Sequence, residues 1–125
     1  MKVGDSVKVT RAFNMQDLHD YTSLGGHRVS GYQVPEPLLG ALFSYLLGVK
    51  LPGLGTNYLK QETRFPAIAR LGETLTAQVE ITRLRPDKQL VDLKTTCKGT
   101  DGRLIANGRA LVYVGDLMGG ADYGH

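Results

Sequence analysis

The sequence predicts a single α+β domain in which an antiparallel β-sheet wraps around one central α-helix. Two patterns support this prediction: a near-apolar run at helical spacing over residues 37–47, and four segments with strand character between residues 58 and 114. A chain of 125 residues is long enough for one hydrophobic core but not for two. We expect residues 1–115 to form the domain and the glycine-rich residues 116–125 to be a flexible C-terminal tail.

The first part of the chain predicts a strand or entry segment followed by a short helix. Residues 2–11 alternate well enough for a first strand. Asn14 can cap the helix, and Asp17 three residues later gives a short variant of the capping box. We expect the helix to end at Gly25 and Gly26, before a loop over residues 27–33. Its apolar face would carry Met15, Leu18, Tyr21 or Thr22, and Leu24.

The second predicted helix is the central one, and it begins around Pro35 and Pro37, where proline is best tolerated. Gly48 is expected to end it, before a turn-rich connector over residues 51–55. Its apolar side chains cover most of its circumference: Leu38, Leu39, Leu42, Phe43, Leu46 and Leu47. One sheet cannot cover such a helix completely, so we expect a second copy to do so through a two-fold axis, in a homodimer or a dimer of dimers.

The rest of the chain predicts antiparallel strands over residues 58–65, 74–82, 90–98 and 104–114. Residues 85–88 form a turn between the second and third of these, and Asp101-Gly102 is a hairpin signal before the fourth. Two strands have a clear inner face, which carries Leu75, Ala77, Val79 and Ile81 in one and Val91, Leu93, Thr95 and Cys97 in the other.

Composition excludes several classes of protein. Hydrophobic residues make up 42% and charged residues 22%, an ordinary globular mixture. The run over residues 37–47 is too short to span a membrane, and no signal peptide is indicated, so we expect a cytoplasmic protein without a membrane partner. The single Cys97 fits a reducing compartment.

Ligand-binding motifs are few. Three histidines and one cysteine at unrelated spacings predict no metal site, and the sequence indicates no cofactor. The net charge of +3 comes from scattered basic residues, without a motif for nucleic acid, so no nucleic-acid partner is expected. These residues could attract the phosphates of coenzyme A or an acidic carrier protein.

The most informative segment is VPEPLLGALFSYLLGVKLPGLGTNYLKQETRF, residues 34–65. It resembles the central helix and following strand of the hot-dog fold in the MaoC-like, (R)-specific enoyl-CoA hydratase family. Within it, KLPGLGTNYLKQETRF is similar to the family's LPGxGxxYLxQxxxF run, and LGETLTAQVEITRL resembles the next strand. The resemblance implies a hot-dog domain that handles acyl groups held as thioesters of coenzyme A or of acyl-carrier protein.

The resemblance breaks at the family's catalytic motif, D-x-N-P-x-H, whose aspartate and histidine jointly hold the water that adds to the double bond. Here the first helix ends in YTSLGG, and only HRVSGYQ precedes VPEP, so the motif and the overhanging turn after it are absent. His27 falls where the family's aspartate is expected. The family's glycine N–H before the helix polarises the thioester carbonyl, but this chain has Pro35-Glu36-Pro37 there, and Pro37 carries no N–H.

Glu36 and His27 are the candidate catalytic residues. Glu36 could act as a base or nucleophile in thioester hydrolysis, as carboxylates on this helix do in other hot-dog thioesterases, or it could only begin the helix. His27 could replace part of the missing pair, or it could be an exposed loop histidine. The resemblance also implies substrate contacts for Tyr32, Val34, Leu38, Ser44, Leu54, Gly55 and Tyr58.

Three functions therefore remain open. The first is a hydratase or dehydratase with its catalysis rearranged around His27 and Glu36. The second is an acyl-CoA thioesterase that uses Glu36. The third is a non-catalytic protein that binds acyl thioesters, since a fold alone does not determine an activity.

Overall fold

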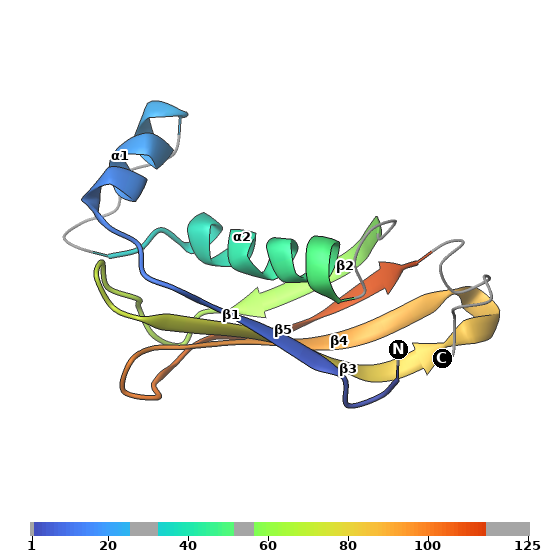
Figure 1. Ribbon diagram of the computed structural model, residues 1–125. Coiled ribbons are helices and arrows are strands. Elements are labelled where there is room, and N and C mark those ends of the chain that lie inside the picture. The colour runs from blue at the N-terminus through green and yellow to red at the C-terminus, as the bar shows by residue number, and fades with distance from the viewer. Residues whose placement is uncertain (1, 26–32, 52–56, 115–125) are drawn as a thin grey trace.

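The computed structural model describes residues 2–25, 33–51 and 57–114 (Figure 1). The predicted tail, residues 116–125, lies outside the described residues. Two helices and a sheet make up the described chain. In chain order its elements are β1 (Ser6–Arg11), α1 (Met15–Ser23), α2 (Glu36–Tyr45) with its continuation η1 (Leu46–Lys50), β2 (Asn57–Arg64), β3 (Leu75–Arg85), η2 (Pro86–Lys88), β4 (Leu90–Lys98) and β5 (Leu104–Tyr113).

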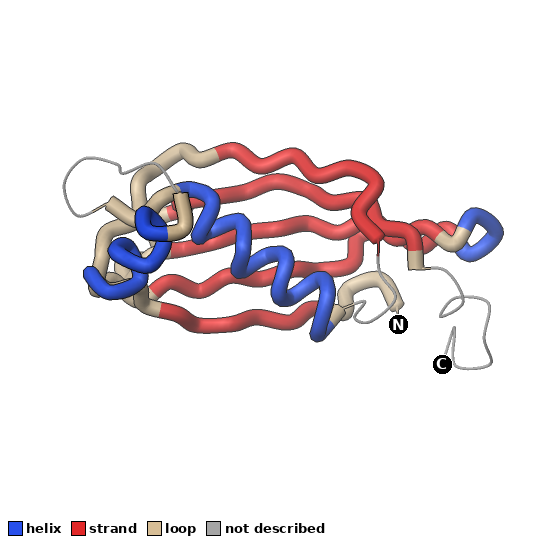
Figure 2. Tube along the Cα trace, turned by 90° about the horizontal axis from the view of Figure 1, so that it is seen from above, coloured by secondary structure: helices blue, strands red, loops and turns tan. Residues whose placement is uncertain are grey.

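The strands form one antiparallel sheet in the order β1-β3-β4-β5-β2. Helix α2 lies across one face of this sheet, as Figure 2 shows from above. The predicted hot-dog arrangement is therefore confirmed. The chain's first segment is a full member of the sheet, because β1 pairs with β3 and places Val9 opposite Ala77. The sheet thus has five strands, one more than the four predicted after the helix.

The hydrophobic core lies between α2 and the inner face of the sheet. The predicted inner faces are confirmed: the alternate residues 75–81 of β3 and 91–97 of β4 are all fully buried. Burying each large aliphatic side chain contributes about 1.5–3 kcal/mol, so this face supplies much of the domain's stability. The helix side of the core consists of Leu39, Phe43, Leu46 and Leu47.

Helix α2 differs from its prediction in two respects. Gly48 does not end it, because a π-helical turn continues to Lys50, and the N–H of Leu51 donates to the carbonyl oxygen of Leu46 at 2.8 Å. The helix is also not buried on nearly all sides within one chain. Ala41, Ser44 and Tyr45 are exposed, since the sheet covers only the opposite side.

Helix α1 begins as predicted but packs less than predicted. Asn14 Oδ1 accepts the Asp17 N–H at 2.9 Å and Asp17 Oδ2 accepts the Asn14 N–H at 2.8 Å, which completes the capping box. The predicted apolar face is wrong at Met15 and Leu24, which are 52% and 90% exposed, whereas Leu18 is buried and Tyr21 and Thr22 are half-buried. The reason is visible in Figure 1, where α1 projects from the body of the domain.

The turns between the last strands match the sequence prediction. Pro86 to Lys88 form a 3₁₀ turn, and Gln89 follows it in the left-handed region with φ of 57°.

Gly108 on β5 lies opposite Thr63 of β2 and Thr95 of β4. A methyl group added at Gly108 would overlap the carbonyl oxygen of Glu62, so only glycine lets β2 approach β5 this closely.

Glu73 joins the loop before β3 to the hairpin between β4 and β5. It accepts the Arg70 N–H at 3.0 Å, the Thr100 N–H at 3.2 Å and the Arg103 guanidinium at 2.9 Å. Burial alone would raise the pKa of Glu73, but these hydrogen bonds and the positive charge of Arg103 outweigh it and hold the pKa below its usual value. The ionised carboxylate therefore stabilises this end of the sheet.

Glu73→Gln is expected to lower the free energy of unfolding by about 1–3 kcal/mol at pH 7, because the amide cannot accept all these bonds. A carboxylate whose pKa is lowered by folding adds its full contribution to the free energy of unfolding above its unfolded pKa, near 4.5. That contribution is lost as the pH falls through the folded pKa. Urea unfolding should therefore show that the free energies of unfolding of variant and wild type differ less at pH 3.5 than at pH 7. Asp87→Asn, at an exposed position, is the control and should change stability by less than about 0.5 kcal/mol. A difference that is the same at both pH values would contradict this role for Glu73.

Candidate functional site

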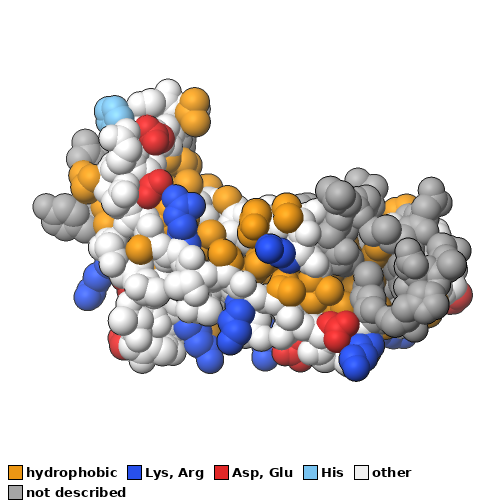
Figure 3. All heavy atoms as spheres, in the orientation of Figure 1, with side chains coloured by type: hydrophobic (Ala, Val, Ile, Leu, Met, Phe, Trp, Pro, Cys, Tyr) orange, Lys and Arg blue, Asp and Glu red, His pale blue; other side chains and the backbone are white. Residues whose placement is uncertain are grey.

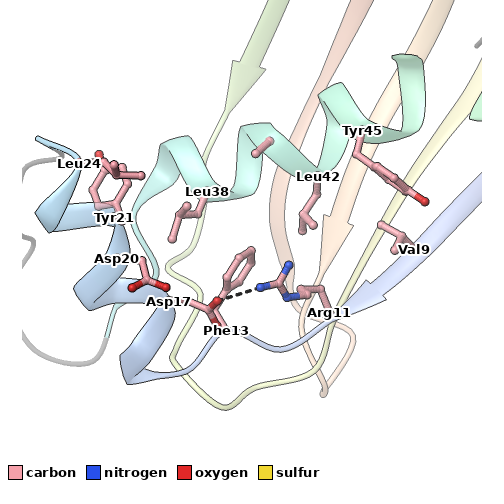
Figure 4. A pocket seen from close by; sticks show the side chains of 11 residues that line it. Val9, Arg11, Phe13, Asp17, Asp20, Tyr21, Leu24, Leu38, Leu42 and Tyr45 are labelled. Carbon is pink, nitrogen blue, oxygen red and sulfur yellow. Dashed lines mark hydrogen bonds and ion pairs between the residues drawn. The ribbon is translucent and has the colours of Figure 1, made fainter. Parts of the chain in front are cut away.

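A groove of about 620 Å³ lies between α1, the exposed side of α2 and the end of β1 (Figure 4). This volume lies within the usual range for small-molecule sites. The lining side chains come from these three places: Val9, Arg11 and Phe13; Asp17, Asp20, Tyr21 and Leu24; and Leu38, Ala41, Leu42 and Tyr45. Figure 3 shows hydrophobic side chains on the surface at the foot of the projecting α1 and along the body beside it.

The groove has an apolar floor because two periodic patterns converge on it. Along β1, every second residue points toward α2, which places Val9 and then Arg11 on the inner side. On α2, the lining residues fall at spacings of three and four, which is one face of a helix. Phe13 and Leu42 are buried at 4% and 7% exposure, and Leu38 is half-buried.

The charged groups of the groove lie toward α1 and are largely paired. The Arg11 guanidinium donates to Asp17 Oδ1 at 2.9 Å and lies 4.5 Å from the centre of the Phe13 ring. Because Asp17 also caps α1, its carboxylate has a structural role and is poorly placed to accept a substrate proton. Asp20 Oδ1 accepts a hydrogen bond from the Gln16 amide at 2.9 Å.

Among the predicted substrate contacts in the described residues, Leu38 lines this groove, whereas Val34 and Ser44 do not. Val34 is buried in the hydrophobic core, and its N–H donates to the Ala69 carbonyl oxygen at 2.8 Å. Ser44 is exposed on α2 but lies outside the groove. Predictions for residues outside the described part of the chain remain predictions: His27, Tyr32, Leu54, Gly55 and the side chain of Tyr58, whose backbone pairs with Val112.

Glu36 occupies the first turn of α2, where it is exposed and not part of the groove lining. The neighbouring positions offer few N–H donors for an oxyanion. Pro35 and Pro37 have none, and the Leu38 N–H donates to the Pro35 carbonyl oxygen at 3.0 Å. The first turn of α2 is therefore a weak site for stabilising a developing negative charge.

Cys97 is a core residue, as its place in the strand pattern predicted. It is fully buried on β4, and burial, with a smaller contribution from the negative charge of Glu73, raises the pKa of its thiol to about 11. Because the thiolate is the nucleophilic form, Cys97 is unsuited to covalent catalysis at neutral pH.

Two further properties concern the described residues alone. Within them, no three side chains of His, Cys, Asp or Glu are grouped closely enough to hold a metal ion. Neither helix in the described part of the chain has the length and apolarity needed to span a bilayer.

Sequence reasoning missed Arg11, Asp20, Ala41 and Tyr45 as parts of a site, and it assigned Asp17 only to the helix cap. The signal was present in two places. Arg11 continues the alternation of Val7 and Val9, and the spacing of residues 38, 41, 42 and 45 marks a second face of α2. That α1 projects and leaves this face open could not be deduced from spacing.

Known proteins provide an independent comparison. No model of a known protein family matches the chain. An (R)-specific enoyl-CoA hydratase from Rhodospirillum rubrum is 31% identical over 128 aligned positions, which cover 91% of this chain and 88% of that protein.

Solved structures agree with this relationship. The (R)-hydratase from Aeromonas caviae involved in PHA biosynthesis has a TM-score of 0.86 and 30% identity, with 91% of this chain and 97% of that chain covered. A hypothetical thioesterase with coenzyme A from Streptococcus pneumoniae has a TM-score of 0.69 at 17% identity, covering 90% of this chain and 81% of that chain, a likeness of fold alone. The shared sheet and central helix, together with the identity over most of both chains, place this chain in the (R)-specific enoyl-CoA hydratase family of hot-dog proteins.

Proposed function

We propose that this chain binds acyl thioesters of coenzyme A or acyl-carrier protein, and that its hydratase activity is lost or altered. One observation carries the proposal. The chain is similar to an (R)-specific enoyl-CoA hydratase over 91% of its length, yet it contains no Asn-Pro pair and therefore no D-x-N-P-x-H motif. The parts that form the fold are kept, and the part that activates water is missing.

Hydration of an enoyl thioester makes three chemical demands. A base must activate water, an acid must protonate the carbon next to the carbonyl, and N–H donors must stabilise the enolate-like charge. In this proposal His27 and Glu36 are the residues left to supply the first two, and the proline-flanked start of α2 is a poor substitute for the third. Binding makes none of these demands. The substrate contacts that the resemblance implies remain predictions: Tyr32, Val34, Leu38, Ser44, Leu54, Gly55 and Tyr58.

Thioester hydrolysis by Glu36 is the second candidate. The observation that favours it is the exposed carboxylate in the first turn of α2. The scarcity of N–H donors beside it argues for a slow reaction.

We also propose that two copies associate through a two-fold axis. Strand β2 is at one edge of the sheet, and its Leu59 is 57% exposed. Sedimentation equilibrium at micromolar concentration is expected to give twice the chain mass of 13.6 kDa, or four times it for a dimer of dimers. A single species at the chain mass would contradict the assembly.

Incubation of the pure protein with crotonyl-CoA tests the loss of hydration. We expect the rate of loss of enoyl absorbance to be at least about three orders of magnitude below typical enzyme efficiencies, because the catalytic pair is missing. A normal rate would show that His27 and Glu36 form a working replacement. His27→Ala should then remove most of that activity.

Release of free thiol from a panel of saturated acyl-CoAs tests hydrolysis, since these substrates cannot be hydrated. If Glu36 is the base or nucleophile, Glu36→Gln should abolish thiol release while the melting temperature stays nearly unchanged, because the position is exposed. Hydrolysis that survives this change would leave Glu36 as a helix-start residue. No thiol release from the wild type would favour the non-catalytic binding protein.

A further inference from the structure

We propose that the groove between α1 and α2 holds the uncharged alkyl tail of the acyl group, for a length of about eight carbons. The proposal rests on the proposed function, since it assumes that the chain binds acyl thioesters. It assigns the tail to the face of α2 that carries Ala41 and Tyr45. The resemblance, in contrast, implies a contact at Ser44, on a part of α2 outside the groove.

The chemistry of the lining favours an uncharged occupant. The floor is made of Phe13, Leu42 and the half-buried Leu38. Arg11, the cation of the lining, is paired with Asp17 and stacked on Phe13, so its charge is already balanced. Asp20 leaves a net negative charge at the α1 end, which disfavours a phosphate or a free carboxylate there.

The size of the groove favours a small molecule over a protein partner. Eleven side chains of the described residues line about 620 Å³. A stable protein–protein interface uses roughly 20–30 residues on each side, whereas small-molecule sites occupy about 300–1,000 Å³. A single alkyl chain can occupy such a groove without help from another protein.

The length of the groove limits the length of the alkyl tail that it can hold. From Leu38 to Tyr45 the helix advances seven residues, or about 10 Å at 1.5 Å per residue. An extended alkyl chain advances about 1.3 Å per carbon, given C–C bonds near 1.5 Å and staggered torsions. About eight carbons therefore fit. Tyr45, which points toward Val9 in Figure 4, is the last lining residue on α2.

Binding of the thioethers S-butyl-, S-octyl- and S-dodecyl-CoA, measured by titration calorimetry, tests the assignment, because a thioether can be neither hydrated nor hydrolysed. Each buried methylene should raise affinity about two- to fourfold, so S-octyl-CoA should bind at least about tenfold more tightly than S-butyl-CoA. S-dodecyl-CoA should gain little more, since its end would lie in solvent.

Three tryptophan variants of exposed positions on one helix locate the tail: Ala41→Trp, Ser44→Trp and Val49→Trp. Ala41→Trp fills the groove and should weaken S-octyl-CoA binding at least about tenfold while changing S-butyl-CoA binding much less. Val49→Trp adds the same bulk outside the groove and should leave both affinities unchanged. Melting temperatures of the variants check that each remains folded.

The outcomes separate this inference from the proposed function. Loss of S-octyl-CoA binding in Ser44→Trp, with Ala41→Trp unaffected, would place the tail on the Ser44 side and overturn the groove assignment alone. Equal affinity for S-butyl- and S-octyl-CoA would overturn it as well. If the wild type bound none of the three thioethers, the proposed function would fail, and the assignment with it.

Discussion

The structure depends on one packing constraint: a helix with apolar side chains around most of its circumference meets a single curved sheet. The sheet covers the side that carries Leu39, Phe43, Leu46 and Leu47, which are buried. It cannot cover the opposite side, where Ala41 and Tyr45 are exposed. The groove beside α1 is a consequence of this uncovered side.

The position of α1 decides what the uncovered side becomes. The Arg11–Asp17 ion pair and the capping box between Asn14 and Asp17 fix the start of this helix at the end of β1. Phe13 lies between the two elements in the chain, and its side chain is almost fully buried in the core. The helix then projects from the body, so it forms a wall instead of a cover. A local set of polar contacts thus turns an exposed apolar surface into a groove.

Most of the fold followed from local patterns. Strict alternation identified the inner faces of β3 and β4, and the Asn14 cap and the Asp101-Gly102 turn were read from residue type. The errors arose where tertiary contacts decide. Gly48 was expected to end α2, but a π-turn carries the helix to Lys50. The groove was not predicted, because Arg11 and Tyr45 are distant in sequence and line one groove only through the placement of β1 beside α2.

Gly108 constrains how this sequence can diverge. Because β2 passes over it without room for a methyl group, even alanine would push the edge strand away from β5. Neighbouring positions such as Asn107 and Arg109 point their side chains outward and can change without moving the backbone. Over evolutionary time this glycine should therefore persist while the residues around it drift. It offers a fixed point for aligning relatives whose catalytic segments have been lost or replaced.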